Sequence, residues 1–157
     1  MKVYHTSNIE IQTPDVIHSR RYLDFGQGFY VTPLEEQALK YGARFKVRGI
    51  TPVINEYEFS LDTTKGKYKK FDSYDEEWLD FVAGNRDGRI VEEYDVIEGG
   101  VANDKVFDTI DLYFSGRMSK TDALQKLMYL KPNWQICIRS DEVIKSSLKF
   151  VTSRTLG

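Results

Sequence analysis

The chain has 157 residues, which is typical of one domain, and we expect residues 1–157 to form a single domain. Its 22 basic and 24 acidic residues give a formal net charge of −2, which excludes a polybasic nucleic-acid clamp as the main design. One cysteine and two histidines exclude an internal disulfide and a cysteine- or histidine-rich metal site, so we expect no metal.

The first part of the chain predicts two strands followed by a helix. Lys2–Thr6 alternates apolar and polar residues briefly, and Gln27–Thr32 is a second short strand led in by glycines. A helix is predicted over Pro33–Arg44, because Thr32 is a good N-cap and Glu35 completes a Thr-x-x-Glu capping box. The apolar residues on one face of this helix are Leu34, Ala38, Tyr41 and Phe45.

The middle of the chain predicts a strand over Val53–Ser60 and then a second helix. Ser73 and Glu76 form another capping box at the start of this helix, and Asn85–Gly88 ends it. The apolar stripe of the helix consists of Trp78, Leu79, Phe81 and Val82. The basic segment Lys65–Lys70 predicts a solvated loop, with contact to a macromolecular target as the alternative.

The last part of the chain predicts short strands and helices in irregular order. Tyr94–Ile97 is a short strand, and Asn103 or Asp104 caps a helix that ends near Gly116. The remaining predicted elements are a helix capped by Ser119 and ended by Pro132, a strand over Trp134–Arg139, a helix over Asp141–Lys145 capped by Ser140, and a strand over Leu148–Thr152.

This order of elements favours an α+β fold, because strands and helices do not alternate regularly. No Gly-x-Gly-x-x-Gly motif follows a strand and no Walker loop is present, which argues against a doubly wound nucleotide-binding fold. The N-terminus has no apolar signal region and no apolar run approaches ~18 residues, so we expect a cytoplasmic protein with no membrane partner. Delivery by a dedicated secretion machine stays open. Cys137 lies in an apolar strand and is predicted to be a buried structural thiol.

Three segments combine residues that suit chemistry: Tyr4-His5-Thr6-Ser7, Leu23-Asp24-Phe25-Gly26-Gln27-Gly28-Phe29-Tyr30 and Gln135-Ile136-Cys137. Their order resembles the ADP-ribosyltransferase superfamily, and within it the His-Tyr-Glu branch of poly-ADP-ribose polymerases and diphtheria-toxin-like enzymes. With Val101-Ala102-Asn103-Asp104, the pattern is similar to a bacterial family of unknown function in that superfamily. The resemblance spans nearly the whole chain and implies a split β-sheet core with flanking helices.

The resemblance implies that NAD binds as a substrate at the end of the first strand. In the family, a strand-end histidine hydrogen-bonds the adenosine ribose and the backbone of the next residue holds the nicotinamide amide. These positions are His5 and Thr6 here, where better-known relatives have a glycine after the histidine. Ser7 contacts ribose or satisfies a turn. Taken alone, a histidine such as His5 is more often structural, and only its context favours a ligand role; His18 matches no pattern and is structural or exposed.

The resemblance assigns Tyr30 and Tyr41 to the two walls of a nicotinamide slot. Aromatic faces attract a flat cationic ring by stacking and cation–π contacts, worth ~0.5–2 kcal/mol each. Gly28 is expected to let the backbone approach the ligand closely. Because 13% of the residues are aromatic, the alternative is that both tyrosines belong to the core.

The third family position is Gln135, where many family enzymes have a glutamate, so the implied catalytic set is His5, Tyr30 and Gln135. An amide can orient the nicotinamide ribose, but it carries no negative charge. This favours mono-transfer, another charge-supplying group, or a weak or inactive enzyme. The unplaced carboxylates that could supply charge are Glu98, Asp104 and Glu142. On the structural interpretation, Gln135 merely faces solvent.

Arg20 and Asp24 precede the second predicted strand. An arginine there suits bidentate binding of a pyrophosphate, and Asp24 would orient it or meet a ribose. Arg21 is the alternative pyrophosphate ligand. The structural interpretation is an exposed Arg20–Asp24 ion pair worth at most ~1 kcal/mol.

The function implied by the resemblance is that of a NAD-dependent mono-ADP-ribosyltransferase. It would transfer ADP-ribose to a protein or nucleic-acid acceptor and release nicotinamide. By family analogy it would also be a bacterial toxin with a cognate antitoxin protein. The alternatives are a module that binds NAD or ADP-ribose without turnover, and a structural domain with no nucleotide site.

Overall fold

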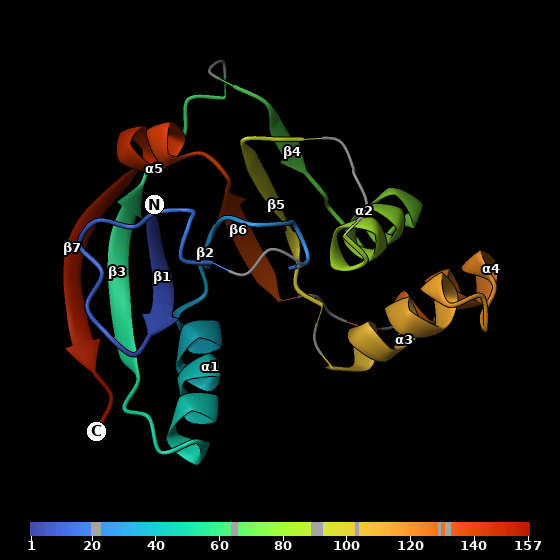
Figure 1. Ribbon diagram of the computed structural model, residues 1–157, viewed down its shortest axis with the longest axis horizontal. Coiled ribbons are helices and arrows are strands. Elements are labelled where there is room, and N and C mark those ends of the chain that lie inside the picture. The colour runs from blue at the N-terminus through green and yellow to red at the C-terminus, as the bar shows by residue number, and fades with distance from the viewer. Residues whose placement is uncertain (20–22, 64–65, 89–92, 103, 129, 131–132) are drawn as a thin grey trace.

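The computed structural model describes residues 1–19, 23–63, 66–88, 93–102, 104–128, 130 and 133–157 (Figure 1). The elements in chain order are β1 (Lys2–Ser7), β2 (Phe29–Val31), α1 (Glu35–Val47), β3 (Val53–Phe59), β4 (Tyr68–Lys70), α2 (Glu76–Arg86), β5 (Val96–Gly100), α3 (Asp104–Phe114), α4 (Lys120–Leu127), β6 (Trp134–Ile138), α5 (Asp141–Ser147) and β7 (Leu148–Thr155). This confirms the prediction of an α+β fold.

The strands form two separate sheets that meet at β1 and β2. One sheet has the order β1-β3-β7 and is antiparallel throughout. The other has the order β2-β6-β5-β4, in which only the β4–β5 pair is parallel. Within the described residues, one isolated bridge joins the sheets: Tyr4 N donates to Thr32 O at 2.8 Å and Thr32 N donates to Tyr4 O at 2.9 Å. Beyond this bridge the two sheets diverge.

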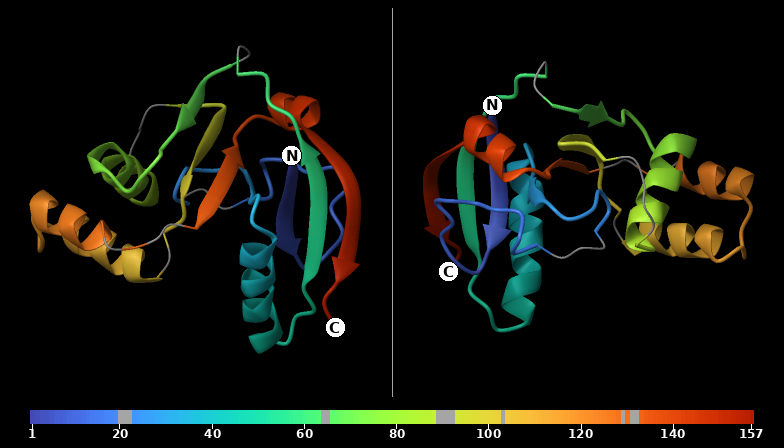
Figure 2. Two further views of the ribbon diagram at one scale, coloured as in Figure 1. Left: turned by 180° about the vertical axis from the view of Figure 1, so that it is seen from behind. Right: turned by 45° about the horizontal axis from the view of Figure 1, so that its top comes forward.

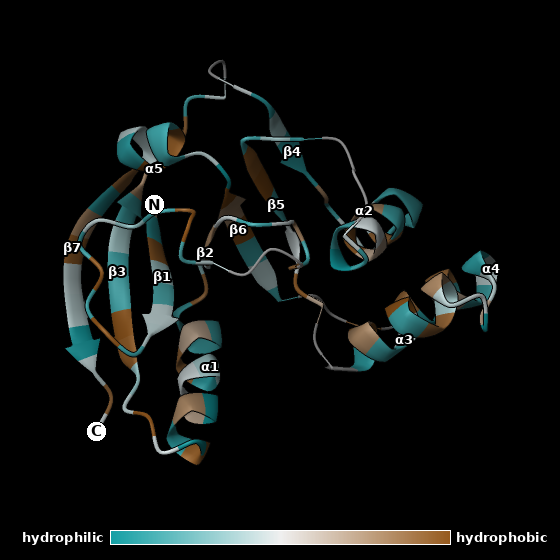
Figure 3. Ribbon diagram, viewed as in Figure 1, coloured by the Kyte–Doolittle hydropathy of each residue, from teal (hydrophilic) through white to brown (hydrophobic). Residues whose placement is uncertain are grey.

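Helices cover the two sheets at opposite ends of the molecule. In Figure 1 and in both views of Figure 2, α1 lies beside β1, whereas α2, α3 and α4 lie beyond the second sheet. Figure 3 shows that the helices carry both hydrophobic and hydrophilic residues, as expected where one face covers a core and the other meets water. Among the described residues, no helix combines the length and the apolarity needed to cross a membrane.

Two main clusters of buried side chains stabilise this arrangement. The cluster between the sheets draws on both of them and includes Val3, Phe29, Tyr57, Ile136 and Ile138. The cluster between the second sheet and its helices includes Phe25, Trp78, Ile97, Ile110 and Leu127. Each fully buried apolar side chain of this size contributes about 1.5–3 kcal/mol. The apolar stripe predicted for the second helix is confirmed, because all four of its residues lie on α2 and are buried in this second cluster.

Two of the three predicted serine caps are confirmed. Ser119 Oγ accepts from Asp122 N at 3.1 Å at the start of α4, and Ser140 Oγ accepts from Val143 N at 3.4 Å at the start of α5. At α2 the prediction of Ser73 as the cap is wrong, because Asp75 accepts from Trp78 N at 2.8 Å instead. Asn103, predicted as a cap of α3, lies outside the described residues.

The predicted start of α1 is wrong. The helix begins at Glu35 and has no side-chain cap, so the capping box of Thr32 and Glu35 does not form. The Thr32 hydroxyl instead accepts from Leu34 N at 3.1 Å, and the Thr32 backbone is paired with Tyr4 across the junction of the sheets. The buried residues of α1 are Ala38 and Gly42, so Tyr41 does not lie on the buried face.

The prediction of a loop over Lys65–Lys70 is wrong for Tyr68–Lys70, which form β4 at the edge of the second sheet; Lys65 lies outside the described residues. The hydroxyl of Tyr68 donates to Glu98. The ammonium of Lys69 pairs with Glu77 and lies 5.1 Å from the ring centre of Phe71. Lysines are common on edge strands, where they hinder pairing with another chain.

Candidate functional site

A pocket of about 1090 Å³ opens where the two sheets diverge. This volume is just above the range of about 300–1,000 Å³ typical of small-molecule sites. Its lining includes every described residue that the resemblance assigned to a site: His5, Thr6, Ser7, Asp24, Gly28, Tyr30, Tyr41 and Gln135. These residues come from β1, β2, α1, β6 and the segment before β2. Arg20 and the alternative Arg21 lie outside the described residues.

One wall of the pocket is the segment after β1, which is fastened to β3. The buried side chain of Asn55 accepts from Ile11 N at 2.9 Å and donates to Ile9 O at 3.1 Å. The hydroxyl of Tyr57 donates to Ile11 O at 2.6 Å. Two side chains of β3 thus hold a pocket wall that no local motif marks in the sequence.

His5 lies at the junction of the sheets and is held in one orientation. Its Nδ1 is 2.6 Å from Tyr30 O, and its ring stacks on Phe29 with the ring centres 4.3 Å apart. Burial lowers the pKa of His5 below its usual value of 6.5, an effect larger than the opposing one of the Tyr30 carbonyl, so the ring is neutral near pH 7. Because a carbonyl only accepts hydrogen bonds, Nδ1 carries the proton and Nε2 is left as an acceptor.

The lowered pKa of His5 makes a prediction about stability. A histidine whose pKa is lower in the folded than in the unfolded protein stabilises the fold above pH 6.5, and this contribution is lost as the pH falls below 6.5 through the lowered pKa of the folded protein. We therefore expect wild type to lose more unfolding free energy than His5→Gln between pH 7.5 and pH 5.0. Urea unfolding of both proteins at each pH measures this. A difference between the two proteins that does not change with pH would contradict the placement of His5.

The side chains of Thr6 and Ser7 are engaged with the protein itself. Thr6 Oγ1 donates to Ala38 O at 2.8 Å, which ties the end of β1 to α1. Ser7 Oγ donates to Asn8 Oδ1 at 3.3 Å, in line with the alternative that Ser7 satisfies a turn. Both residues still line the pocket. Their hydroxyls are therefore positioning groups for the wall rather than free donors.

The two tyrosines assigned to a nicotinamide slot line the same pocket in different ways. The hydroxyl of Tyr30 donates to Gly26 O at 2.5 Å and accepts from Phe25 N at 3.0 Å, so it fixes the turn before β2. Burial raises the pKa of Tyr30 well above its usual value, so the hydroxyl stays neutral. Tyr41 is 44% exposed, and its ring lies 5.6 Å from that of Phe45 and 5.9 Å from the guanidinium of Arg44.

Gly28 is required by packing within the protein. A Cβ at this position would lie 2.5 Å from Cys137 Sγ and 2.8 Å from Ile138 O. The close approach predicted for a ligand is thus a close approach of β6 to the segment before β2. Cys137 itself is buried, and burial raises the pKa of its thiol to about 12. This confirms a structural thiol rather than a nucleophile.

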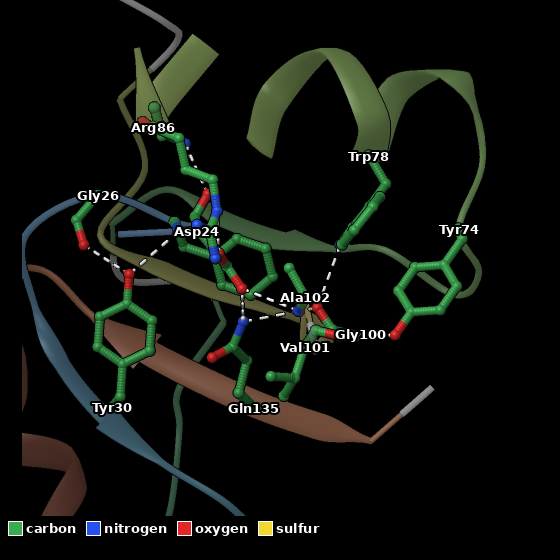
Figure 4. A network of polar contacts seen from close by, with 12 residues as sticks. Asp24, Gly26, Tyr30, Tyr74, Trp78, Arg86, Gly100, Val101, Ala102 and Gln135 are labelled. Atoms are coloured by element: carbon green, nitrogen blue, oxygen red, sulfur yellow. Dashed lines mark hydrogen bonds and ion pairs between the residues drawn. The ribbon is translucent and has the colours of Figure 1, made fainter. Parts of the chain in front are cut away.

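The polar centre of the pocket is Asp24, whose partner is Arg86 on α2 (Figure 4). Arg86 Nε and Nη2 donate to Asp24 Oδ1 at 2.7 and 2.5 Å. Asp24 Oδ2 accepts from Ala102 N at 2.9 Å and from Gln135 Nε2 at 3.2 Å. The expectation of an exposed ion pair at Asp24 is therefore wrong, because the carboxylate is buried and shared between three elements.

Arg86 is a pocket residue that the sequence did not predict. It lies 62 residues from Asp24 in the chain, and its guanidinium carbon is 4.1 Å from the ring centre of Phe107 on α3. The position of this arginine depends on how α2 and α3 pack against the second sheet. No local spacing marks it, and the only signal is a basic residue at the end of an apolar stripe.

Gln135 is 9% exposed, so the interpretation that it faces solvent is wrong. Its Nε2 also lies 3.5 Å from Gly100 O. The segment after β5 is fastened to the α2 region: Trp78 Nε1 donates to Gly100 O at 3.2 Å and the Tyr74 hydroxyl donates to Val101 O at 2.6 Å (Figure 4). The amide of Gln135 therefore sits against a rigid backbone.

Two of the other candidate carboxylates, Glu98 and Glu142, do not join this site. Glu98 is engaged by Tyr68 and by Trp134 Nε1 at 3.3 Å, and the exposed Glu142 lies on α5; neither is among the described residues that line the pocket. Nothing is described for the side chain of Asp104. His18 is exposed and bonds to Asp15. Within the described ranges, no group of three His, Cys, Asp or Glu side chains is arranged to hold a metal ion.

Comparison with known proteins gives one match. A protein-family model described as "Protein of unknown function (DUF3990)" matches residues 1–150. No curated protein and no solved structure matches the chain.

Proposed function

The chain belongs to the DUF3990 family, whose description names no function, and we propose that it is a NAD-dependent mono-ADP-ribosyltransferase. The observation that carries this proposal is the pocket of about 1090 Å³, which is lined by all the described residues that the resemblance assigned to a site. Residues spread from His5 to Gln135 in the sequence converge on it. The split between β1 and β2, with the pocket at the split, supports an ADP-ribosyltransferase-like core.

The chemistry of the lining suits a dinucleotide with a flat cationic ring. The Nε2 acceptor of His5 fits a ribose hydroxyl, which donates. The rings of Tyr30 and Tyr41 offer aromatic faces for nicotinamide. The cations on the lining are Lys40 and Arg44 on α1 and Arg86 on α2; of these, Arg44 has no carboxylate within ion-pair distance among the described residues, which suits a pyrophosphate.

In the proposed reaction the bond between the nicotinamide nitrogen and the ribose carbon breaks. Its electron pair leaves with nicotinamide, which becomes neutral. A nucleophilic atom of the acceptor forms a bond to the same carbon and loses its proton to water. The ribose carbon carries positive charge between these events, so the protein contributes by positioning and by electrostatic stabilisation. His5, Tyr30 and Gln135 are the residues proposed for these roles.

A neutral amide at Gln135 favours a single transfer over polymer formation. It offers no charge to activate a hydroxyl of a bound ADP-ribose for further addition. The same observation favours the second candidate function, a module that binds NAD or ADP-ribose without turnover. Binding would be similar in both cases, and only the release of nicotinamide separates them.

The acceptor and the biological role are proposals by analogy with the resembling family. The acceptor is a protein or a nucleic acid, and the protein would act in the cytoplasm as a toxin that a cognate antitoxin protein neutralises. An antitoxin that covers the pocket would protect the host cell from the reaction.

The experiment uses the purified chain, NAD labelled on its adenosine, and separate protein and nucleic-acid fractions of a bacterial lysate. We expect released nicotinamide in proportion to label that stays on one of the two fractions as single ADP-ribose units. Saturable binding of NAD without nicotinamide would favour the binding module. The absence of any NAD binding would contradict both candidate functions.

A further inference from the structure

The contacts of Asp24 leave the amide of Gln135 one orientation. A carboxylate has no proton to donate, so the amide must turn its NH₂ end toward Asp24 Oδ2, 3.2 Å away. Gly100 O, 3.5 Å from the same nitrogen, also only accepts. Two acceptors on one side thus direct Nε2 into the protein and Oε1 away from this network (Figure 4). Because Gln135 lines the pocket, Oε1 is the end of the amide that is left for a ligand.

Asp24 is itself held from two further sides. Arg86 donates to its Oδ1 from α2, and Ala102 N donates to its Oδ2 at 2.9 Å from the segment after β5. Arg86 is placed in turn by the ring of Phe107, 4.1 Å from its guanidinium carbon. The carboxylate therefore cannot turn without losing the hydrogen bonds from Arg86 and from Ala102 N. It is thus held rigidly enough to orient the amide of Gln135.

We propose that Asp24 is a positioning residue, which fixes the amide of Gln135 so that Oε1 accepts a hydrogen bond from a substrate hydroxyl, and that this carboxylate is the reason why position 135 carries glutamine. That this hydroxyl belongs to the nicotinamide ribose rests on the proposed function. The pairing of Asp24 with Gln135 does not depend on the proposed function.

A glutamate at position 135 would place two carboxylates side by side. Among the described residues, the ionisable groups around Asp24 include Arg86 from α2, Tyr30 from β2, Tyr74 before α2 and Cys137 from β6. Burial raises the pKa values of the tyrosines and of the thiol, so these three are neutral near pH 7. One guanidinium then faces two negative charges, and the introduced carboxyl keeps its proton more readily than a free one. Glutamine has the same shape without this cost.

The first test is Gln135→Glu, with Gln125→Glu on the exposed side of α4 as the control for the same chemical change. A carboxyl whose pKa is raised by folding destabilises the fold at high pH, where it is ionised. This penalty falls as the pH decreases through the raised pKa, and it is absent below the unfolded pKa of ~4.3. We expect Gln135→Glu to be less stable than wild type at pH 8 and to approach it as the pH falls toward 5. Gln125→Glu should stay at a constant offset. Equal pH dependence of the two variants would overturn the proposal.

The second test asks whether Asp24 acts through Gln135. Asp24→Asn, Gln135→Ala and the double variant are compared by nicotinamide release at saturating NAD. We expect each single change to lower the rate by at least ~10-fold, and the double variant to be no more than ~2-fold below the slower single variant. Losses that multiply would show independent roles and overturn the positioning role.

The two tests distinguish a failure of the proposed function from a failure of the positioning role of Asp24. If wild type releases no nicotinamide, the proposed function fails, whereas the pH dependence of Gln135→Glu still decides whether Asp24 dictates the residue at position 135. The result with Gln135→Glu also decides it if Asp24→Asn does not fold. At neutral pH we further expect no gain in nicotinamide release from Gln135→Glu, although it restores the glutamate of the resembling enzymes.

Discussion

Replacement of Asp24 by alanine is expected to lower the free energy of unfolding by about 2–4 kcal/mol. The change removes the acceptor for Arg86, for Ala102 N and for Gln135 Nε2 at once. The carboxylate is 7% exposed, so water cannot replace it freely, whereas the side chain of Arg86 is 25% exposed and regains part of its hydration. This partial exposure places the loss below that of a fully buried ion pair.

Urea unfolding at pH 7.5 measures this loss, with Asp75→Ala as the matched control. Asp75 is also an aspartate that accepts a backbone hydrogen bond, but it lies exposed at the start of α2, where the loss of an N-cap costs about 1 kcal/mol. Asp24→Ala should lose clearly more than this control. Equal losses would mean that the network around Asp24 does not stabilise the fold.

The second large effect is expected for His5→Ala, which should lower nicotinamide release by at least ~100-fold. Loss of one preorganised polar contact to a reacting substrate commonly costs ~10²–10³-fold in rate. The substitution removes the Nε2 acceptor together with the ring that stacks on Phe29 and donates to Tyr30 O. NAD turnover by the purified variant, compared with wild type, gives the ratio.

The control for His5→Ala is Tyr113→Phe. Tyr113 lies on α3, outside the pocket, and its hydroxyl donates to Asp80. This variant should release nicotinamide at the wild-type rate. If His5→Ala folds and retains a third or more of the wild-type rate, the assignment of His5 to the reaction is wrong.

Elements with a local signal could be predicted from the sequence. Alternation marks β1 and β3, and Ser119 and Ser140 cap their helices because the acceptor and the donor lie three residues apart. The capping box at Thr32 does not form, because the helix begins at Glu35 and the Thr32 hydroxyl accepts from Leu34 N instead. The backbone pairing of Thr32 with Tyr4, 28 positions earlier in the sequence, is a tertiary contact that no pattern near Thr32 reveals.

The candidate site likewise has residues that the sequence predicts and contacts that it does not. The motifs around His5, Tyr30 and Gln135 identified side chains that line one pocket, because each motif keeps its residues at the end or on the face of a strand. The internal contacts of the pocket were not predictable. Asp24 meets Arg86 only after α2 packs on the second sheet, and Gly28 meets Cys137 only after β2 pairs with β6. Such contacts depend on tertiary packing rather than on spacing.

We infer that the pocket between the two sheets binds NAD. Titration calorimetry of the full chain with NAD, on wild type and on His5→Ala, tests it most directly. We predict saturable binding at one site per chain for wild type and weakened binding for the variant, with the folded state of both checked by unfolding curves. No heat of binding with wild type, or equal affinity of the two proteins, would contradict the claim.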